Sequence, residues 1–167
     1  MVRQLVAIGA SMGGTVVLES LLARLPADMP PIVIVQHTLP HFVAAFVRQL
    51  DAVSPMDVSE AVDGAVLGPG MVSVASGGSH LVVEREGDVL RTILASGPPV
   101  RFHRPSVDVL FHSLVTLPDV DIVAVLLTGF AYTTFLERKV IARMQPSVHL
   151  AWRPDSSGTV GRLSDEG

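Results

Sequence analysis

Two short apolar runs, each followed at once by an amphipathic helical pattern, most constrain what this chain can fold into. Residues 4–9 and 30–37 are typical of buried strands, and the prolines of the second run stand only at its entry. Apolar side chains recur at helical spacing from Thr15 to Leu25 and again from Phe42 to Leu50. Because strands and helices that alternate at this spacing form βαβ units, the pattern predicts an α/β fold with a parallel sheet.

The middle of the chain has closely spaced glycines and alternating strands instead. Residues 80–94 predict an antiparallel hairpin that turns at residues 86–88. A helix is expected within residues 104–117, with Ser106 as its N-cap. Residues 121–129 predict one more buried strand, and beyond it the periodicity weakens.

Composition narrows the class of protein. The 167 residues are 49% hydrophobic and only 17% charged, which favours strands buried on both faces. The chain has no cysteine, which excludes disulfides and cysteine nucleophiles, and a net charge of −4, which gives no reason to expect nucleic acid as a partner. A membrane span needs about 18 apolar residues, and no stretch reaches that length. Without a recognisable signal peptide either, we expect a cytoplasmic protein with no membrane insertion.

A serine stands between two glycines where the first strand ends. The segment from Gly9 to Gly13 fits the pattern G-x-S-x-G, in which a nucleophile sits on a sharp turn between a strand and a helix. Side chains two residues before or after Ser11 would clash there, so both positions are expected to be glycine. Backbone N–H groups that follow the serine, at the helix N-terminus, can stabilise an oxyanion.

Two other interpretations of this turn stay open. A phosphate-binding loop would need glycine in place of Ser11 and an acidic residue at the end of the second strand, but that strand ends at Gln36 and His37. Nucleotide binding is therefore a distant alternative. The other is a plain glycine turn in which the serine only caps the helix.

His37 favours the nucleophile. It ends the second strand as Ser11 ends the first, and the ends of adjacent parallel strands lie about 5 Å apart. A serine needs a base to act as a nucleophile at neutral pH, and an imidazole suits that role. Taken alone, His37 would be interpreted as a structural histidine at a helix entry, but beside Ser11 we interpret it as the base.

The other histidines give no metal pattern. His37 and His41 are four residues apart, but Pro40 intervenes and no carboxylate is close in sequence. His103 and Arg104, just before a helix start, are candidates to face the same cleft, with structural capping as the alternative. The remaining histidines have no ligand-like spacing; they are His80, His112 and His149.

With these residues in place, the chain resembles the catalytic domain of CheB-type protein-glutamate methylesterases of bacterial chemotaxis. The motifs that carry the resemblance are "IGASMGG", "VIVQHTLPHF", "SVASGGSHL", "GPPVRFHRPSVDVLFHSL" and "AVLLTG". They place a methylesterase-like catalytic core at residues 1–129 and a divergent segment of the same domain at residues 130–167. Family members usually carry a receiver domain ahead of this one, and none is expected here.

The resemblance implies a fold and an activity. The fold is a doubly wound, mainly parallel sheet with helices on both faces. The activity is hydrolysis of glutamate methyl esters on methyl-accepting chemoreceptors, often with deamidation of receptor glutamines. Ser11 would be the nucleophile and His37 the general base, with the oxyanion held by the Met12 backbone N–H and by N–H groups near His37. No metal or cofactor is implied, and a chemotaxis kinase or receiver protein in trans is a candidate partner.

One departure bears on catalysis. After Thr-Gly the family reads M-G-x-D-G, and its aspartate orients the histidine, whereas Thr133 stands at that position here and both loop glycines are absent. Loss of the orienting carboxylate of a triad costs about 10⁴-fold in kcat. None of the nearby acids is assigned the third role; they are Glu137, Asp108, Asp119 and Asp121. The sequence therefore predicts an impaired serine hydrolase or, alternatively, an inactive remnant or receptor-binding module with the same fold.

The abrupt end of the match has its own interpretation. Glycines and apolar pattern fail together after residue 129, which suggests a frameshift, a truncation or a decaying gene. Without the family's C-terminal strand, an apolar edge of the sheet would be left uncovered.

Overall fold

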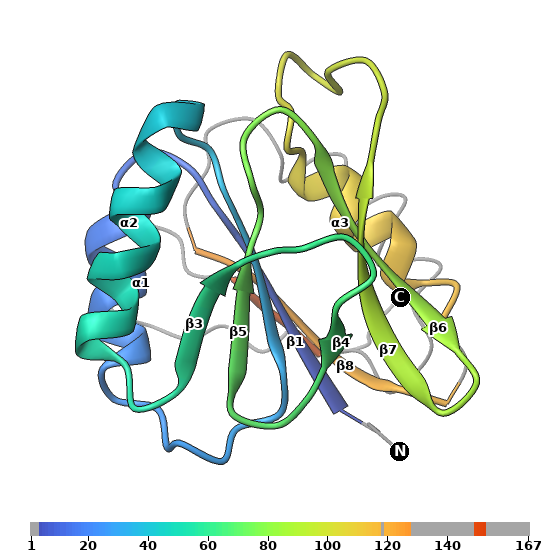
Figure 1. The fold of residues 1–167 in the computed structure, drawn as a ribbon, viewed down its shortest axis with the longest axis horizontal. Coiled ribbons are helices and arrows are strands. Elements are labelled where there is room, and N and C mark those ends of the chain that lie inside the picture. The colour runs from blue at the N-terminus through green and yellow to red at the C-terminus, as the bar shows by residue number, and fades with distance from the viewer. Residues whose placement is uncertain (1–3, 118, 128–148, 153–167) are drawn as a thin grey trace, which may run out of the picture.

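The first apolar run forms an inner strand of a parallel sheet (Figure 1). The structure is a computed structural model that describes residues 4–117, 119–127 and 149–152, the last by backbone only. Six strands lie in the order β3-β5-β2-β1-β8-β9, and their pairings are all parallel. They are β1 (Gln4–Ala10), β2 (Ile32–Gln36), β3 (Asp57–Glu60), β5 (Met71–Val74), β8 (Asp121–Leu126) and β9 (His149–Trp152).

Side chains of the inner strands alternate between two cores, one on each face of the sheet. In β1, Leu5 and Ala7 join one core, whereas Ile8 and Ala10 join the other. All five residues of β2 are buried. This two-sided burial is why these strands read as continuous apolar runs.

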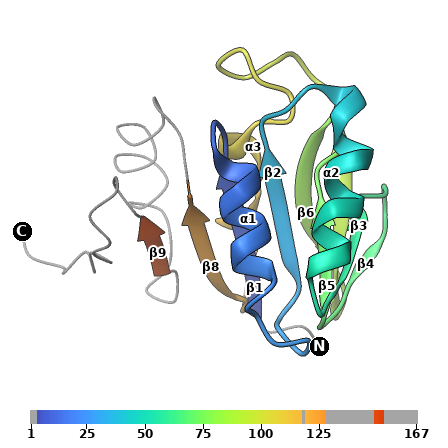
Figure 2. The ribbon, with the colours of Figure 1, turned by 90° about the vertical axis from the view of Figure 1, so that its left-hand side faces the viewer.

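The sheet is covered on both faces. Helices α1 (Gly14–Leu22) and α2 (Pro40–Val53) lie together on one face (Figure 2). Helix α3 (Val107–Leu114) and a three-stranded antiparallel sheet lie on the other; its strands are β4 (Val66–Leu67), β7 (Val89–Ala95) and β6 (His80–Glu86). The predicted doubly wound α/β fold with an antiparallel hairpin is therefore confirmed.

Element boundaries differ from the sequence predictions in a few places. Helix α1 ends at Leu22, three residues early, and α2 begins at Pro40, where a proline suits the first helical position. The hairpin turn is confirmed, since Glu86 pairs with Val89. Ser106 is the N-cap of α3, but its side chain makes no capping hydrogen bond and is buried instead.

The last described strand corrects one expectation. Strand β9 runs parallel to β8 and pairs with it from Val123 to Leu126, so the edge of β8 is covered. The sequence missed this strand because four residues offer too short a period to recognise. Among the helices that the structure describes, none is long and apolar enough to cross a membrane.

The two glycines that flank Ser11 serve different purposes. A Cβ added at Gly9 would lie 2.4 Å from Cγ1 of Val107, so this glycine lets β1 pack closely against α3. Gly13 meets nothing within 4 Å, but its φ of +76° is left-handed. The expected steric reason therefore holds for Gly9, whereas Gly13 is needed for its backbone conformation.

We expect Gly9→Ala to lower the free energy of unfolding by about 1–3 kcal/mol, because the added methyl overpacks the contact with Val107. In a Val107→Ala background the same change should cost less, since the clashing methyl groups are gone. Urea denaturation of the four proteins measures this coupling. Equal costs of Gly9→Ala in both backgrounds would contradict the steric explanation.

Candidate active site

Ser11 lies directly after β1, at the carboxyl edge of the sheet. Its carbonyl accepts a hydrogen bond from the N–H of Gly14 (2.9 Å), which closes a tight turn into α1. Met12 and Gly13 form the turn, and the Met12 side chain is 91% exposed. The strand–turn–helix context that a nucleophile on a sharp turn requires is therefore present.

The register of β1 and β2 brings His37 to the same place. Ala10 pairs with Gln36, so Ser11 and His37 are each the next residue of paired strands. The His37 N–H donates to the Ala10 carbonyl at 3.0 Å, which continues the ladder by one bond. The two residues predicted to meet at this edge are thus brought together by strand pairing.

A buried amide ties the two loops to each other. The Gln36 side chain is 5% exposed, and its Nε2 donates to the carbonyls of Ser11 (2.8 Å) and His37 (3.0 Å). Gly14 leaves room for it, because a Cβ there would lie 2.3 Å from the Gln36 Oε1. Sequence analysis used Gln36 only as evidence against a nucleotide site. A polar residue at the end of an otherwise apolar buried strand was the available signal.

Three loops line an open cavity of about 500 Å³ at these residues. The first loop contributes Ser11 and Met12, and the second contributes residues 37–39. The third contributes residues 102–105, which precede α3. For His103 and Arg104 the sequence left two interpretations open, a place in the cleft or a structural cap. Both residues line the cavity.

The rings of His37 and His103 are stacked. Their centroids are 3.8 Å apart and their planes differ by 3°. Burial, and secondarily the charge of His103, lower the pKa of His37 from 6.5 to about 4. Near neutral pH His37 is therefore an uncharged imidazole, which is the form that accepts a proton.

A strained turn presents His103. Val100 and His103 exchange two backbone hydrogen bonds of 3.0 Å, and between them Arg101 and Phe102 have φ values of 49° and 68°. Left-handed backbone at residues other than glycine costs about 1–3 kcal/mol each, and such strain is concentrated at functional sites. Phe102, at the tip, is 99% exposed.

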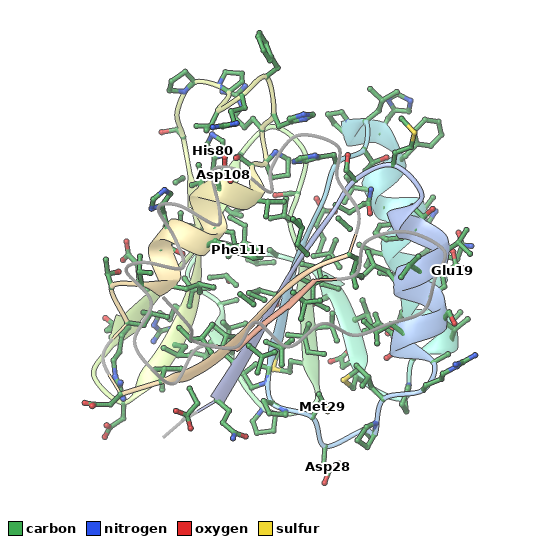
Figure 3. The ribbon with its side chains drawn as sticks, turned by 180° about the vertical axis from the view of Figure 1, so that it is seen from behind. Glu19, Asp28, Met29, His80, Asp108 and Phe111 are labelled. Atoms are coloured by element: carbon green, nitrogen blue, oxygen red, sulfur yellow. The ribbon has the colours of Figure 1, made fainter. Side chains whose placement is uncertain are left out.

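The base of this third loop is fixed to the body of the domain. His80 Nδ1 accepts the Ser106 N–H at 3.2 Å, so its Nε2 carries the hydrogen and donates to the Pro98 carbonyl at 3.0 Å. Arg104 Nη1 donates to the Gly97 carbonyl at 2.6 Å. Figure 3 shows His80 at the end of α3 where Asp108 also lies.

Asp108 is a buried acid beside the same loop. It is 2% exposed and lies 3.4 Å from the Arg101 guanidinium. Burial raises the pKa of its carboxyl, although the charges of Arg101 and His112 oppose that shift. Asp108 does not line the cavity, so it contacts the third loop through Arg101, on the side away from the cavity.

Two other acids considered as a third member, Asp119 and Asp121, are not at this site. Asp121 pairs with Gln4, which places it and the preceding Asp119 at the opposite edge of the sheet, as expected. Thr133 and Glu137 lie outside the described residues. Within the described part of the chain, no group of three or more acidic or histidine side chains is placed to hold a metal ion.

Comparison with known proteins decides the family. The family model described as CheB methylesterase matches residues 6–144, which is most of the chain. The chain belongs to the CheB methylesterase family. The match includes Ser11 and His37, and it runs past residue 129, where the motif resemblance ends.

Curated relatives and a solved structure agree with this family. A protein-glutamate methylesterase/protein-glutamine glutaminase of Sulfurimonas denitrificans is 45% identical over 127 residues, 76% of this chain and 36% of that protein. A relative of Anaeromyxobacter dehalogenans with the same activities in its name is 46% identical over 75% of this chain and 36% of its own length. The chain thus spans about a third of the length of these relatives.

The fold comparison is equally direct. The crystal structure of the Thermotoga maritima CheB methylesterase catalytic domain matches with a TM-score of 0.73 and 34% identity. The match covers 76% of this chain and 68% of that one.

The raised pKa of Asp108 predicts how stability depends on pH. Folded Asp108 keeps its proton at pH values where the unfolded chain has lost it, so its ionisation destabilises the fold as pH rises above 3.8. Asp108→Asn cannot ionise. Its free energy of unfolding, relative to the unchanged chain, should therefore increase from about pH 4 to about pH 7.

Urea denaturation across this pH range measures the difference. Asp88→Asn is the control, because Asp88 is an exposed acid of the hairpin turn and its removal changes the net charge equally. A relative stability of Asp108→Asn that falls as pH rises would show that the Arg101 ion pair outweighs burial.

Proposed function

We propose that this chain is a serine hydrolase that removes methyl esters from glutamates of chemoreceptors. The observation that carries the proposal is the register of β1 and β2, which places Ser11 and His37 side by side on one cavity. Family membership supports the same chemistry. The names of the relatives add deamidation of protein glutamines as a second reaction of this site.

Ser11 and His37 divide the chemistry between them. The Ser11 Oγ attacks the ester carbonyl while the neutral His37 ring accepts its proton. The tetrahedral intermediate expels methoxide, which takes the proton from His37 and leaves as methanol. Water then attacks the acyl-enzyme with the same base, which frees the glutamate and restores Ser11. A glutamine substrate would release ammonia in the first half of this sequence.

The first loop provides the proposed hydrogen-bond donor for the oxyanion. The His37 N–H already donates to the Ala10 carbonyl, so it is committed to the strand ladder. The Met12 N–H, at the start of the turn into α1, is the proposed donor, with the N-terminal end of the helix adding a favourable field.

The rim of the cavity suits a protein substrate. Large apolar side chains from all three loops stand in solvent there, with Met12 91%, Leu39 57% and Phe102 99% exposed. Exposed apolar groups around a polar centre are typical of a surface that binds another protein. We propose that a chemoreceptor helix in the cytoplasm covers this rim, and that a chemotaxis kinase or receiver protein regulates the site in trans.

One observation favours the alternative of an inactive receptor-binding module. The described lining of the cavity holds no carboxylate, and a pKa of about 4 makes His37 a weak proton acceptor. A base with a low pKa is unprotonated at neutral pH, as it must be to accept a proton. Its affinity for that proton is weak, however, so it does little to drive proton transfer from the serine. We therefore propose that turnover is slow, and that Thr133 at the family's aspartate position is the cause.

Methanol release from methylated chemoreceptor tests the activity. We expect a slow release that Ser11→Ala abolishes and that His37→Gln lowers by about 10²–10⁴-fold, because each removes one half of the proton-transfer pair. Ser20→Ala, on the exposed side of α1, is the control and should leave the rate unchanged. Release that persists in folded Ser11→Ala would reject Ser11 as nucleophile. Binding to receptor with no serine-dependent release would favour the module.

Restoring the family's loop tests the role of Thr133. The combined substitution Phe130→Met, Ala131→Gly, Thr133→Asp and Thr134→Gly recreates M-G-x-D-G. We expect kcat to rise by up to about 10⁴-fold, because a carboxylate that orients the base and stabilises its cation is restored. The matched control carries the same changes without Thr133→Asp. Equal rates in the two proteins would show that the missing carboxylate is not the limit.

A further inference from the structure

The contact between His37 and His103 is unusual in its geometry. The two rings lie face to face at 3.8 Å with only 3° between their planes, and both line the cavity. His37 comes from the loop after β2, whereas His103 comes from the loop before α3. The contact therefore joins two loops that belong to different parts of the chain.

A general base needs its ring plane fixed. The second side-chain torsion of histidine is broad, so packing or hydrogen bonds must select one ring orientation. In a triad a carboxylate does this through a hydrogen bond to the ring. Thr133 stands at the family's aspartate position here, so a flat neighbour that restrains the ring gains importance.

The strained turn gives His103 little freedom. Two backbone hydrogen bonds between Val100 and His103 close it, and Arg101 is held from behind by Asp108. Arg104 follows directly and is bonded to the Gly97 carbonyl. His103 is thus presented from a loop that is fixed on both sides.

The charged side chains of the cavity also favour an uncharged His37. His103 and Arg104 are the other titratable side chains of the described lining, and neither is an acid. Two imidazolium rings at stacking distance repel, so a flat stack is compatible with an uncharged His37.

We infer that His103 is a positioning residue of this site, which holds the His37 ring in the plane that proton transfer from Ser11 requires. The inference rests on the proposed role of His37 as the base. His103 acts through His37 and takes no part in bond making.

Two substitutions of similar size distinguish the effect of a flat aromatic contact from the effect of side-chain bulk. His103→Phe keeps an aromatic face against His37, whereas His103→Leu fills the space without one. His41→Ala removes an exposed imidazole from the first turn of α2 and is the control. For each full-length protein, NMR gives the order parameter and the titration of the His37 ring, and methanol release gives kcat and KM.

We expect His103→Leu to lower the His37 order parameter and to reduce kcat by about 10- to 100-fold with little change in KM, because a misplaced base slows chemistry without weakening binding. His103→Phe should keep both near the values of the unchanged chain. In both variants the pKa of His37 should move from about 4 toward 6.5, since the charge of His103 is gone. His41→Ala should change none of these.

Equal effects of the two substitutions, or no effect of either, would overturn the inference. Should His103→Leu not fold, His103→Met replaces it, because methionine has similar bulk and no flat face. The ring measurements need no turnover. A chain without serine-dependent release would defeat the proposed function, while the order parameters would still decide whether His103 positions His37.

Discussion

The parallel pairing of β1 with β2 determines where the proposed active site of this protein lies. The ladder runs without a bulge from Val6 with Ile32 to Ala10 with Gln36, and one further bond joins His37 to Ala10. Both strands therefore end at the same level, and the next residue of each faces the same cavity. Helix α1 packs on one face of the sheet and α3 on the other (Figures 1 and 2), and the cavity lies at this edge between them. Doubly wound sheets bind their ligands at such a point.

Much of this could be predicted from the sequence, because it depends on patterns that repeat. The apolar runs of β1 and β2 and the periodicity of α2 gave the fold class, and the rule that parallel strands end together gave the meeting of Ser11 with His37. Strand β9 was missed because only its pairing with β8 identifies four residues as a strand.

The supporting side chains could not be predicted in the same way. The bridge made by Gln36 needs its rotamer and the space that Gly14 leaves. The stack of His103 on His37 needs a turn whose two central residues, Arg101 and Phe102, are not the glycine or asparagine that signal such backbone. These contacts depend on side-chain direction and on backbone strain. Neither repeats along the sequence in a pattern that could be recognised.

The buried acid Asp108 and the proposed base His37 lie in different surroundings in this domain. The buried carboxylate of the described chain, that of Asp108, lies 3.4 Å from the Arg101 guanidinium and does not line the cavity. For His37, by contrast, burial and secondarily the charge of His103 lower the pKa to about 4. The described residues thus favour a neutral imidazole and provide little to stabilise its charged form. A carboxylate from elsewhere in the chain would have to supply that half of the cycle.

The Gln36 amide couples the loop that carries Ser11 to the loop that carries His37. Its Nε2 is bonded to the backbone of both, and it is itself part of the rigid sheet. A partner that presses on the exposed Met12 or Leu39 side chains cannot move one loop without stretching bonds to the other. The distance between Ser11 and His37, the proposed nucleophile and base, is therefore insulated from the docking of a large partner.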